Sequence, residues 1–191
     1  AETVTEANLH RIKALGGGVA IQHRMAYQGE SFIKRYGKKQ ALFSPPVKKM
    51  LDLGIPVALG TDGTRVASYN LWVALYWITT GKTVGGTQIM APENVLDRTT
   101  ALRLATHKGY ELIKDDTKGK IQKDYFADLV ILDKDYFEAA DHEIKNIKSK
   151  LTIVNGKIVY ADDDYKTLAP ELPAIVPSWS PVKFFGGYQN F

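Results

Sequence analysis

Residues 54–63, with the sequence GIPVALGTDG, decide the fold class of this chain. The run from Ile55 to Leu59 is almost entirely apolar, which is typical of a strand that is buried on both faces. The strand ends at Gly60, and a carboxylate, Asp62, follows two residues later. A carboxylate placed directly after a buried strand raises the question of what it binds.

The segments before this strand predict alternating helices and strands. Residues 4–16 are expected to form a helix that is capped by Thr5 and ended by Gly16. The sequence GGGVAIQH then contains a short buried strand, residues 19–22, and SPPVKKMLDLG predicts a second helix with Ser44 as its N-cap. This alternation indicates an α/β fold with a parallel sheet covered on both faces, and either a barrel or a doubly wound sheet fits the pattern.

The segments after the strand predict more helix and then a change to β structure. The apolar stretch NLWVALYWITT and residues 93–113 are expected to be helical. Three aromatic residues at helical spacing in the first stretch are expected to pack in the core: Trp72, Tyr76 and Trp77. From Lys118 onward, GKIQ, ADLVILD and LTIVNGKIVYA are strand-like, and Asn155-Gly156 predicts a hairpin turn. Three or four strands are too few to form a hydrophobic core of their own. This β unit is therefore expected to pack on the first unit or on strands from elsewhere.

Composition and charge exclude several classes of protein. The chain has 191 residues, 45% of them hydrophobic, which is enough to bury a core. Lys and Arg (25) exceed Asp and Glu (21) by four, but the basic residues are spread singly or in pairs, so no nucleic-acid partner is expected. The absence of cysteine excludes disulfides and thiolate metal ligands within the chain.

The beginning of the chain carries no export or membrane signal. AETVTEANLHRIK lacks the apolar core of a signal peptide, and no run approaches the roughly 18 apolar residues that span a bilayer, so a cytoplasmic protein without a membrane partner is expected. The same residues lack an initiator Met and lead almost at once into a helix. The chain is therefore expected to be a piece of a larger protein.

Two strand ends offer residues for chemistry, because ligands bind outside the carboxyl ends of parallel strands. Asp62 follows the second strand, where it would serve as a metal ligand or general base, or else cap the next helix or make a local turn. His23 and Arg24 follow the first strand, and a hydrogen-bonded imidazole at the sheet edge is as consistent with the sequence as a substrate contact. None of the other histidines has a partner at metal-ligand spacing, and these are His10, His107 and His142.

The order of the segments resembles the carboxyl-terminal part of the amidohydrolase superfamily. The resemblance rests on GGGVAIQH, LGIPVALGTD, PENVLDRTTALRLATHKGYELI, KGKIQKDYFADLVILDKD and LTIVNGKIVYADD, and it covers nearly all of residues 1–165. Within the superfamily, the chain resembles the amidohydrolase family 3 group that includes N-substituted formamide deformylases. LGIPVALGTD is similar to the eighth barrel strand with its closing aspartate, and ADLVILD with TIVNGK is similar to strands of a β-sandwich built from both ends of the chain.

The resemblance implies a metal-dependent hydrolase on a (β/α)8 TIM barrel. Residues 1–116 would be the carboxyl-terminal segment of that barrel, 117–168 part of the composite β-sandwich, and 169–191 an extended tail rich in proline and aromatic residues. One or two divalent cations, most often Zn²⁺, would be bound in the full-length enzyme. Asp62 would be the one family metal ligand in this sequence, and the histidines of the other strands would lie outside it. This piece alone would be inactive.

The same resemblance implies hydrolysis of a carbon–nitrogen bond in a small, amide-like, non-peptide substrate. The cation would lower the pKa of a water molecule, and Asp62 would take its proton and hand it to the leaving nitrogen. His23, Arg24 and Arg65 would line the same mouth and bind a carbonyl oxygen or an anionic group, and a surface role for each arginine is equally consistent with the sequence. The remainder of the polypeptide would be the partner that completes the barrel, and a homo-oligomer is compatible with the exposed strand edges.

Two other interpretations stay open. The chain is also consistent with a non-catalytic remnant of this fold, a regulatory module that binds a partner through its basic surface and aromatic tail. The codons upstream of Ala1 would separate these interpretations, since a reading frame with a His-x-His pair favours the hydrolase and a start codon favours the remnant. A flavodoxin-like or Rossmann domain is a weaker alternative, because the glycines at 16–18 precede the strand and the G-x-G-x-x-G fingerprint is absent.

Overall fold

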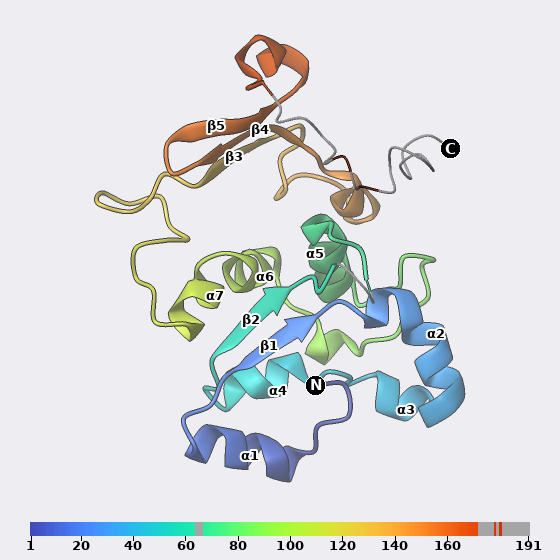
Figure 1. The fold of residues 1–191 in the computed structure, drawn as a ribbon. Coiled ribbons are helices and arrows are strands. Elements are labelled where there is room, and N and C mark those ends of the chain that lie inside the picture. The colour runs from blue at the N-terminus through green and yellow to red at the C-terminus, as the bar shows by residue number, and fades with distance from the viewer. Residues whose placement is uncertain (64–66, 172–177, 179, 181–191) are drawn as a thin grey trace.

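The computed structural model describes residues 1–63, 67–171, 178 and 180, and it has a mixed α/β fold. The elements of its first part are α1 (Glu6–Ala14), β1 (Val19–Gln22), α2 (Met25–Tyr36), α3 (Lys38–Ala41), α4 (Val47–Asp52), β2 (Val57–Gly60), α5 (Leu71–Thr80), η1 (Pro92–Asn94), α6 (Arg98–Ala105) and α7 (His107–Leu112). Those of its second part are β3 (Leu129–Leu132), η2 (Asp141–Asn146), β4 (Ser149–Val154), β5 (Lys157–Ala161) and η3 (Asp163–Leu168). Figure 1 shows β1 and β2 side by side among the helices, with the β3–β4–β5 sheet at one end of the molecule.

The first part contains a parallel pair of strands, as predicted. β1 and β2 run in register from Val19 opposite Val57 to Gln22 opposite Gly60. The helices α4, α5, α6 and α7 all contact β2. A parallel pair needs a crossover connection, and α2, α3 and α4 supply it here. Both carboxyl ends therefore lie at the same edge of the pair.

The second part is an antiparallel sheet in the order β3-β4-β5. The β4–β5 hairpin turns at Asn155 and Gly156, whose φ angles are 51° and 73°. Two consecutive residues with positive φ are what a type I′ turn requires, and this is why Asn-Gly is favoured there. The hairpin prediction is confirmed.

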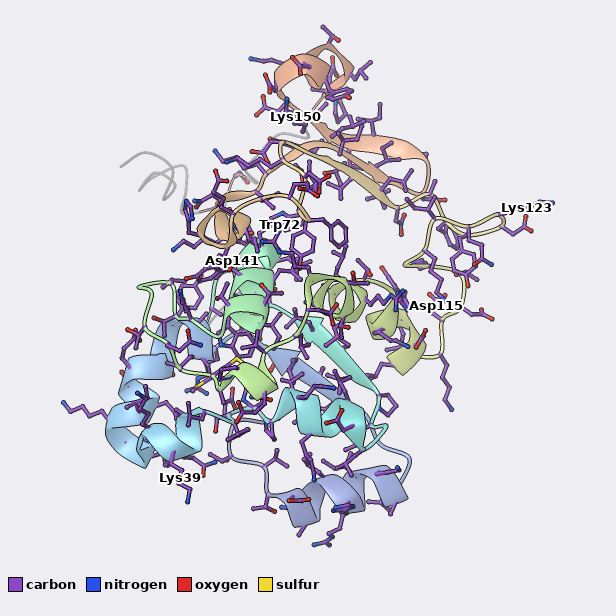
Figure 2. All side chains as sticks on the ribbon, turned by 180° about the vertical axis from the view of Figure 1, so that it is seen from behind. Lys39, Trp72, Asp115, Lys123, Asp141 and Lys150 are labelled. Atoms are coloured by element: carbon purple, nitrogen blue, oxygen red, sulfur yellow. The ribbon has the colours of Figure 1, made fainter. Side chains whose placement is uncertain are left out.

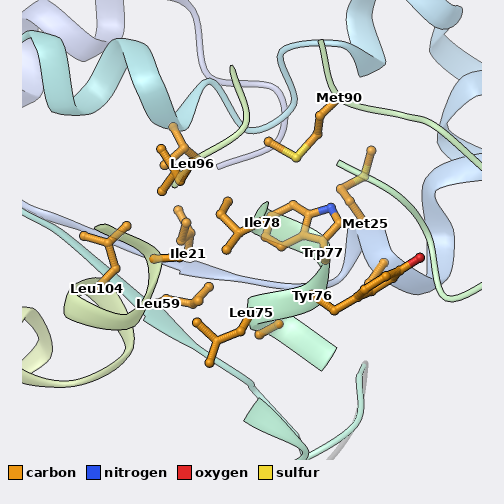
Figure 3. Close-up of a cluster of buried hydrophobic side chains, with 14 of the residues drawn as sticks. Ile21, Met25, Leu59, Leu75, Tyr76, Trp77, Ile78, Met90, Leu96 and Leu104 are labelled. Atoms are coloured by element: carbon orange, nitrogen blue, oxygen red, sulfur yellow. The ribbon is translucent and has the colours of Figure 1, made fainter. Parts of the chain in front are cut away.

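A single apolar core holds the first part together and reaches into the second. Tyr76 and Trp77 of α5 are buried in it and Trp72 is partly buried against it, so the packing role expected for these three aromatic residues is confirmed. Figure 3 shows Ile21 and Leu59 of the two strands among the surrounding helix side chains. The same core includes residues between β3 and β4 of the small sheet: Tyr136, Ile144 and Ile147. The β unit thus packs on the first unit through its β3–β4 connection, which is one of the two arrangements expected.

One guanidinium makes four of the hydrogen bonds between α6 and the segment from Tyr136 to Asp141. Arg98 donates from Nη1 to the carbonyls of Tyr136 and Phe137, both at 2.7 Å. Its Nη2 donates to the carbonyl of Ala139 at 2.7 Å and to Oδ1 of Asp141 at 2.8 Å. Figure 2 shows Trp72 at the end of α5 beside this segment, and its ring lies 5.8 Å from that of Tyr136, centroid to centroid.

One helix was missed and two local predictions were wrong. The sequence reasoning missed α2, although its apolar residues recur with helical spacing. Ser44 does not cap α4, because its hydroxyl donates to the carbonyl of Gln40 at 2.6 Å instead. GKIQ at 119–122 is a loop rather than a strand, with Ile121 91% exposed and no strand paired to it among the described residues.

Two other predictions have different outcomes. The cap of α1 is confirmed, since Oγ1 of Thr5 accepts a hydrogen bond from the backbone N–H of Asn8. Most of the tail at 169–191, with all of its aromatic residues, lies outside the described residues. In the parts of the chain that the structure describes, no helix combines the length and the apolar character that crossing a bilayer would need.

Candidate functional site

The candidate site lies where β1 and β2 end. Gln22 and Gly60 are the last residues of the two strands and face each other in the register. His23 and Arg24 continue from β1, and Thr61 and Asp62 continue from β2. Because the carboxyl ends of parallel strands lie on the same side of a sheet, the two predicted groups of polar residues lie at the same end of the strand pair.

Asp62 presents its carboxylate on the surface. Its side chain is exposed, its φ is 49°, and no hydrogen bond or ion pair joins it to another described residue. A capping role at the next helix does not hold, because Oδ1 of Asn70 accepts the hydrogen bond from the backbone N–H of Trp72 at the start of α5. Asp and Asn tolerate the left-handed conformation better than other non-glycine residues, so the residue type suits the backbone at this position.

His23 is fully buried, whereas the sequence reasoning placed it at the mouth. Neither ring nitrogen makes a hydrogen bond of acceptable geometry with the described residues, and the ring lies 5.6 Å from that of Tyr27. Burial lowers the pKa of the imidazole below its ordinary value, with the Gly60 backbone opposing the shift, so the ring is neutral at pH 7. Further chain can only add cover to a buried side chain, so a substrate at the mouth would not reach it in this conformation.

Arg24 is exposed and begins α2. Its Nε donates to Oε1 of Gln28 at 2.9 Å. The side chain lines a groove of about 300 Å³ between α2 and the first residues of the chain, Glu2 and Thr3. Arg65, the remaining predicted substrate contact, lies outside the described residues.

The described residues do not form a metal site by themselves. No group of three or more His, Asp or Glu side chains gathers at one point within the described ranges. Two histidines lie near a glutamate one helical turn away, His10 beside Glu6 at 3.8 Å and His107 beside Glu111 at 3.6 Å, and neither pair has a third ligand. Asp62 is suited to be one hard, anionic ligand, and the rest of any site must come from other parts of the protein.

The sequence reasoning missed Gln22, which is the last residue of β1. Its side chain is partly exposed and makes no hydrogen bond with the described residues. Side chains alternate between the faces of a strand, so Gln22 and His23 have different surroundings although they are neighbours. The signal that identifies Gln22 is this alternation, counted back from the buried Ile21.

A family model described as the amidohydrolase family matches residues 1–160. A 5-methylthioadenosine/S-adenosylhomocysteine deaminase of Thermotoga maritima is 33% identical over 136 residues, which are 66% of this chain and 32% of that protein. An N-substituted formamide deformylase of Arthrobacter pascens is 28% identical over 119 residues, 60% of this chain and 21% of that protein. The chain spans about a third or less of the length of these curated relatives.

Solved structures share the fold of this chain. A metal-dependent hydrolase of Pyrococcus horikoshii superposes with a TM-score of 0.63 at 18% identity, over 74% of this chain and 29% of that one. An atrazine chlorohydrolase of Arthrobacter aurescens, solved with zinc, superposes with a TM-score of 0.62 at 18% identity, over 91% of this chain and 37% of that one. At such identities the likeness supports the fold alone.

Proposed function

Because the chain belongs to the amidohydrolase family, we propose that the whole protein is a metal-dependent hydrolase that cleaves a carbon–nitrogen bond in a small non-peptide substrate. The observation that carries the proposal is the free carboxylate of Asp62 at the carboxyl end of β2, within the residues that match the family. Carboxyl ends of parallel strands are where α/β enzymes bind their ligands. A carboxylate that serves only a turn or a cap would be hydrogen-bonded to the backbone, and Asp62 makes no such bond with the described residues.

In this proposal, β1 and β2 are the last two strands of a (β/α)8 barrel, and β3–β5 are part of a β-sandwich completed by other segments. The open edges of the β1–β2 pair support the first part, because parallel sheets are normally covered and extended on both sides. The exposed apolar side chains of the small sheet, among them Val130 and Val154, support the second. The remainder of the polypeptide would supply the missing strands.

Asp62 would act as a proton carrier and as a ligand. A divalent cation, with zinc as the first candidate because a structural neighbour was solved with zinc, would make a bound water more acidic and polarise the group under attack. The Asp62 carboxylate has no hydrogen-bond or ion-pair partner among the described residues, so it would be free to accept a proton from the attacking water. It would then deliver that proton to the leaving nitrogen.

The relatives narrow the substrate class. A deaminase and a formamide deformylase both hydrolyse a bond between nitrogen and an sp² carbon, so the reacting group is expected to be an amide or an amidine-like edge. Peptides, nucleic acid and membranes are not expected as partners. The screen should therefore include 5′-methylthioadenosine and N-benzylformamide.

The proposal is tested on the full-length protein with Asp62→Asn. We expect the purified protein to contain zinc or another divalent metal and to hydrolyse at least one of the two probes. Asp62→Asn should keep the fold, because Asn also tolerates positive φ, and lower kcat by about 10²-fold or more. Metal content by mass spectrometry and initial rates by ammonia or formate release are the measurements.

Asp124→Asn is the matched control, because Asp124 is also exposed and has a positive φ of 69° but lies in the loop before β3. Its kcat should equal that of the wild type. An Asp62→Asn enzyme with unchanged kcat would remove Asp62 from the reaction. A full-length protein without metal and without turnover of either probe would overturn the proposed function.

A further inference from the structure

The β1–β2 pair has two faces with different surroundings. On one face, Ile21 and Leu59 are buried in the core beneath the helices, as Figure 3 shows. The other face carries Ala20, Gln22, Ala58 and Gly60, which alternate with those core residues and pair with each other in the register. Ala58 is buried but lies outside the main apolar cluster, Gln22 and Gly60 are partly exposed, and Ala20 is exposed. We call this second face the open face.

The open face becomes polar toward the carboxyl ends of the strands. Its first layer is the alanine pair, Ala20 opposite Ala58, and its second layer is Gln22 opposite Gly60. In a closed barrel the deeper layers are filled by apolar side chains, and the layer at the carboxyl ends faces the ligand. The open face has this order, with apolar residues below and an amide above.

Gly60 leaves space beside the Gln22 amide. Its φ is not in the left-handed region, and a Cβ added to it would meet no atom of the described residues within 4 Å. Neither the backbone conformation nor the packing of the described residues therefore requires glycine here. Space above a strand-end glycine lets a ligand approach the backbone closely.

We infer that Gln22 is a substrate-binding residue that hydrogen-bonds a neutral substrate group in which a donor lies next to an acceptor. Gln22 lies at the carboxyl ends of the strands, as Asp62 does. The inference rests on the proposed function and adds a residue and a chemical preference to it. A glutamine amide donates from Nε2 and accepts at Oε1, so it complements a substrate that presents a donor next to an acceptor. An amide and the amidine edge of an aminopurine both do so, whereas a carboxylate or phosphate presents acceptors alone.

The other polar groups at the strand ends are less suited to this contact. His23 is fully buried. The Arg24 side chain lies along α2, where its Nε donates a hydrogen bond to Oε1 of Gln28. Gln22 has no competing partner among the described residues, so its amide is free to bind a ligand.

The kinetic test compares Gln22→Leu with Gln122→Leu in the full-length protein. Leucine keeps the approximate size of the side chain and removes both polar groups. A buried substrate edge left without its partner should lower kcat/KM for the reactive probe, 5′-methylthioadenosine or N-benzylformamide, about 10- to 100-fold. Gln122 is exposed in the loop between α7 and β3, so the control variant should match the wild type.

A second test does not depend on turnover. The chain has no cysteine, so in Gln22→Cys and Gln122→Cys any thiol labelled within these residues is the introduced one. We expect a methanethiosulfonate reagent to label position 22 in the free protein, and a saturating probe to slow that labelling at least tenfold without changing labelling at position 122. Peptide mass spectrometry after a brief pulse gives both rates.

The outcomes separate this inference from the proposed function. Turnover with equal kcat/KM in Gln22→Leu and Gln122→Leu, or a thiol at position 22 that the probe does not protect, overturns the inference while the hydrolase stands. If neither probe is turned over, protection at position 22 still supports a ligand contact there. Absence of both turnover and protection overturns both.

Discussion

Neighbouring residues at the end of β1 differ sharply in their environments. His23 is fully buried, while Gln22 before it and Arg24 after it reach the surface. Sequence reasoning selected His23 because it follows the strand at 19–22, at the carboxyl end where ligands bind in parallel sheets. Residue type carries no information about which face of the strand a position occupies, and the burial of Ile21 and Leu59 fixes that face.

The buried His23 is expected to make stability depend on pH. Its pKa in the folded protein is lowered from an ordinary value near 6.5, so below pH 6.5 the unfolded chain binds a proton that the folded protein does not. His23 therefore has no effect on the free energy of unfolding above that pH. As pH falls toward the pKa of His23 in the folded protein, His23 lowers the free energy of unfolding increasingly. As pH falls from about one unit above the ordinary pKa to about 1.5 units below it, the urea midpoint of the full-length protein should therefore decrease less steeply in His23→Leu than in the wild type.

His142→Leu is the control for this measurement, because His142 is exposed and belongs to η2 rather than to the core. It should keep the wild-type slope of midpoint against pH. Equal slopes in His23→Leu and His142→Leu would show that His23 does not titrate differently on folding.

At the scale of elements, Arg98 links α6 to the segment between β3 and β4 of the small sheet. Three of its four acceptors are backbone carbonyls, 38 to 41 residues away in the chain. Tyr136 reciprocates, because its hydroxyl donates to the carbonyl of Arg98 at 3.2 Å. Backbone carbonyls are the same in every residue, so this link has no signature in the sequence.

Arg98→Ala is expected to lower the free energy of unfolding by about 2 kcal/mol or more. Hydrogen bonds to a charged donor contribute about 1.5–3 kcal/mol each, and the bonds here are not independent because one side chain makes them all. Arg98→Lys should recover only part of the loss, since an ammonium cannot match the planar fork of the guanidinium. Urea unfolding of the full-length protein gives the free energy of unfolding of the wild type, Arg98→Ala and Arg98→Lys.

Arg103→Ala, on the same helix, is the matched control. The Arg103 side chain is exposed and makes no hydrogen bond with the described residues, so its removal should change stability by about 0.5 kcal/mol or less. A loss in Arg98→Ala no larger than that in Arg103→Ala would contradict the role of this link.

At the scale of the whole molecule, both sheets are incomplete in the described residues. β1 and β2 each leave one edge without a partner. A groove of about 760 Å³ separates Trp72 from the small sheet, and Val130 and Tyr160 on its wall are 47% and 43% exposed. Unpaired edges and exposed apolar side chains are the features that lead to association.

Residues 1–191 expressed alone are therefore expected not to fold stably as a monomer. Size-exclusion chromatography with light scattering should show association, and thermal melting followed by circular dichroism should be broad. Co-expression with the rest of the polypeptide should restore a monodisperse species with a sharp transition. A monomeric mass together with a sharp, cooperative melt of the isolated chain would refute this expectation.

Much of the local structure was predictable from neighbouring residues. Thr5, the Asn155-Gly156 turn and the apolar run before Gly60 each produce their element through short-range geometry, and all three were found. The strand predicted at GKIQ failed because a strand needs a partner, and pairing is not a local property.

The sequence by itself determined the α/β order, the parallel strand pair and the position of Asp62 at a strand end. Only the tertiary structure decided that His23 is enclosed, that Gln22 lies on the open face, and that Arg98 joins two distant segments. The physical reason is that side-chain periodicity and turn chemistry act over a few residues. Burial and long-range hydrogen bonds depend instead on which segments meet in space.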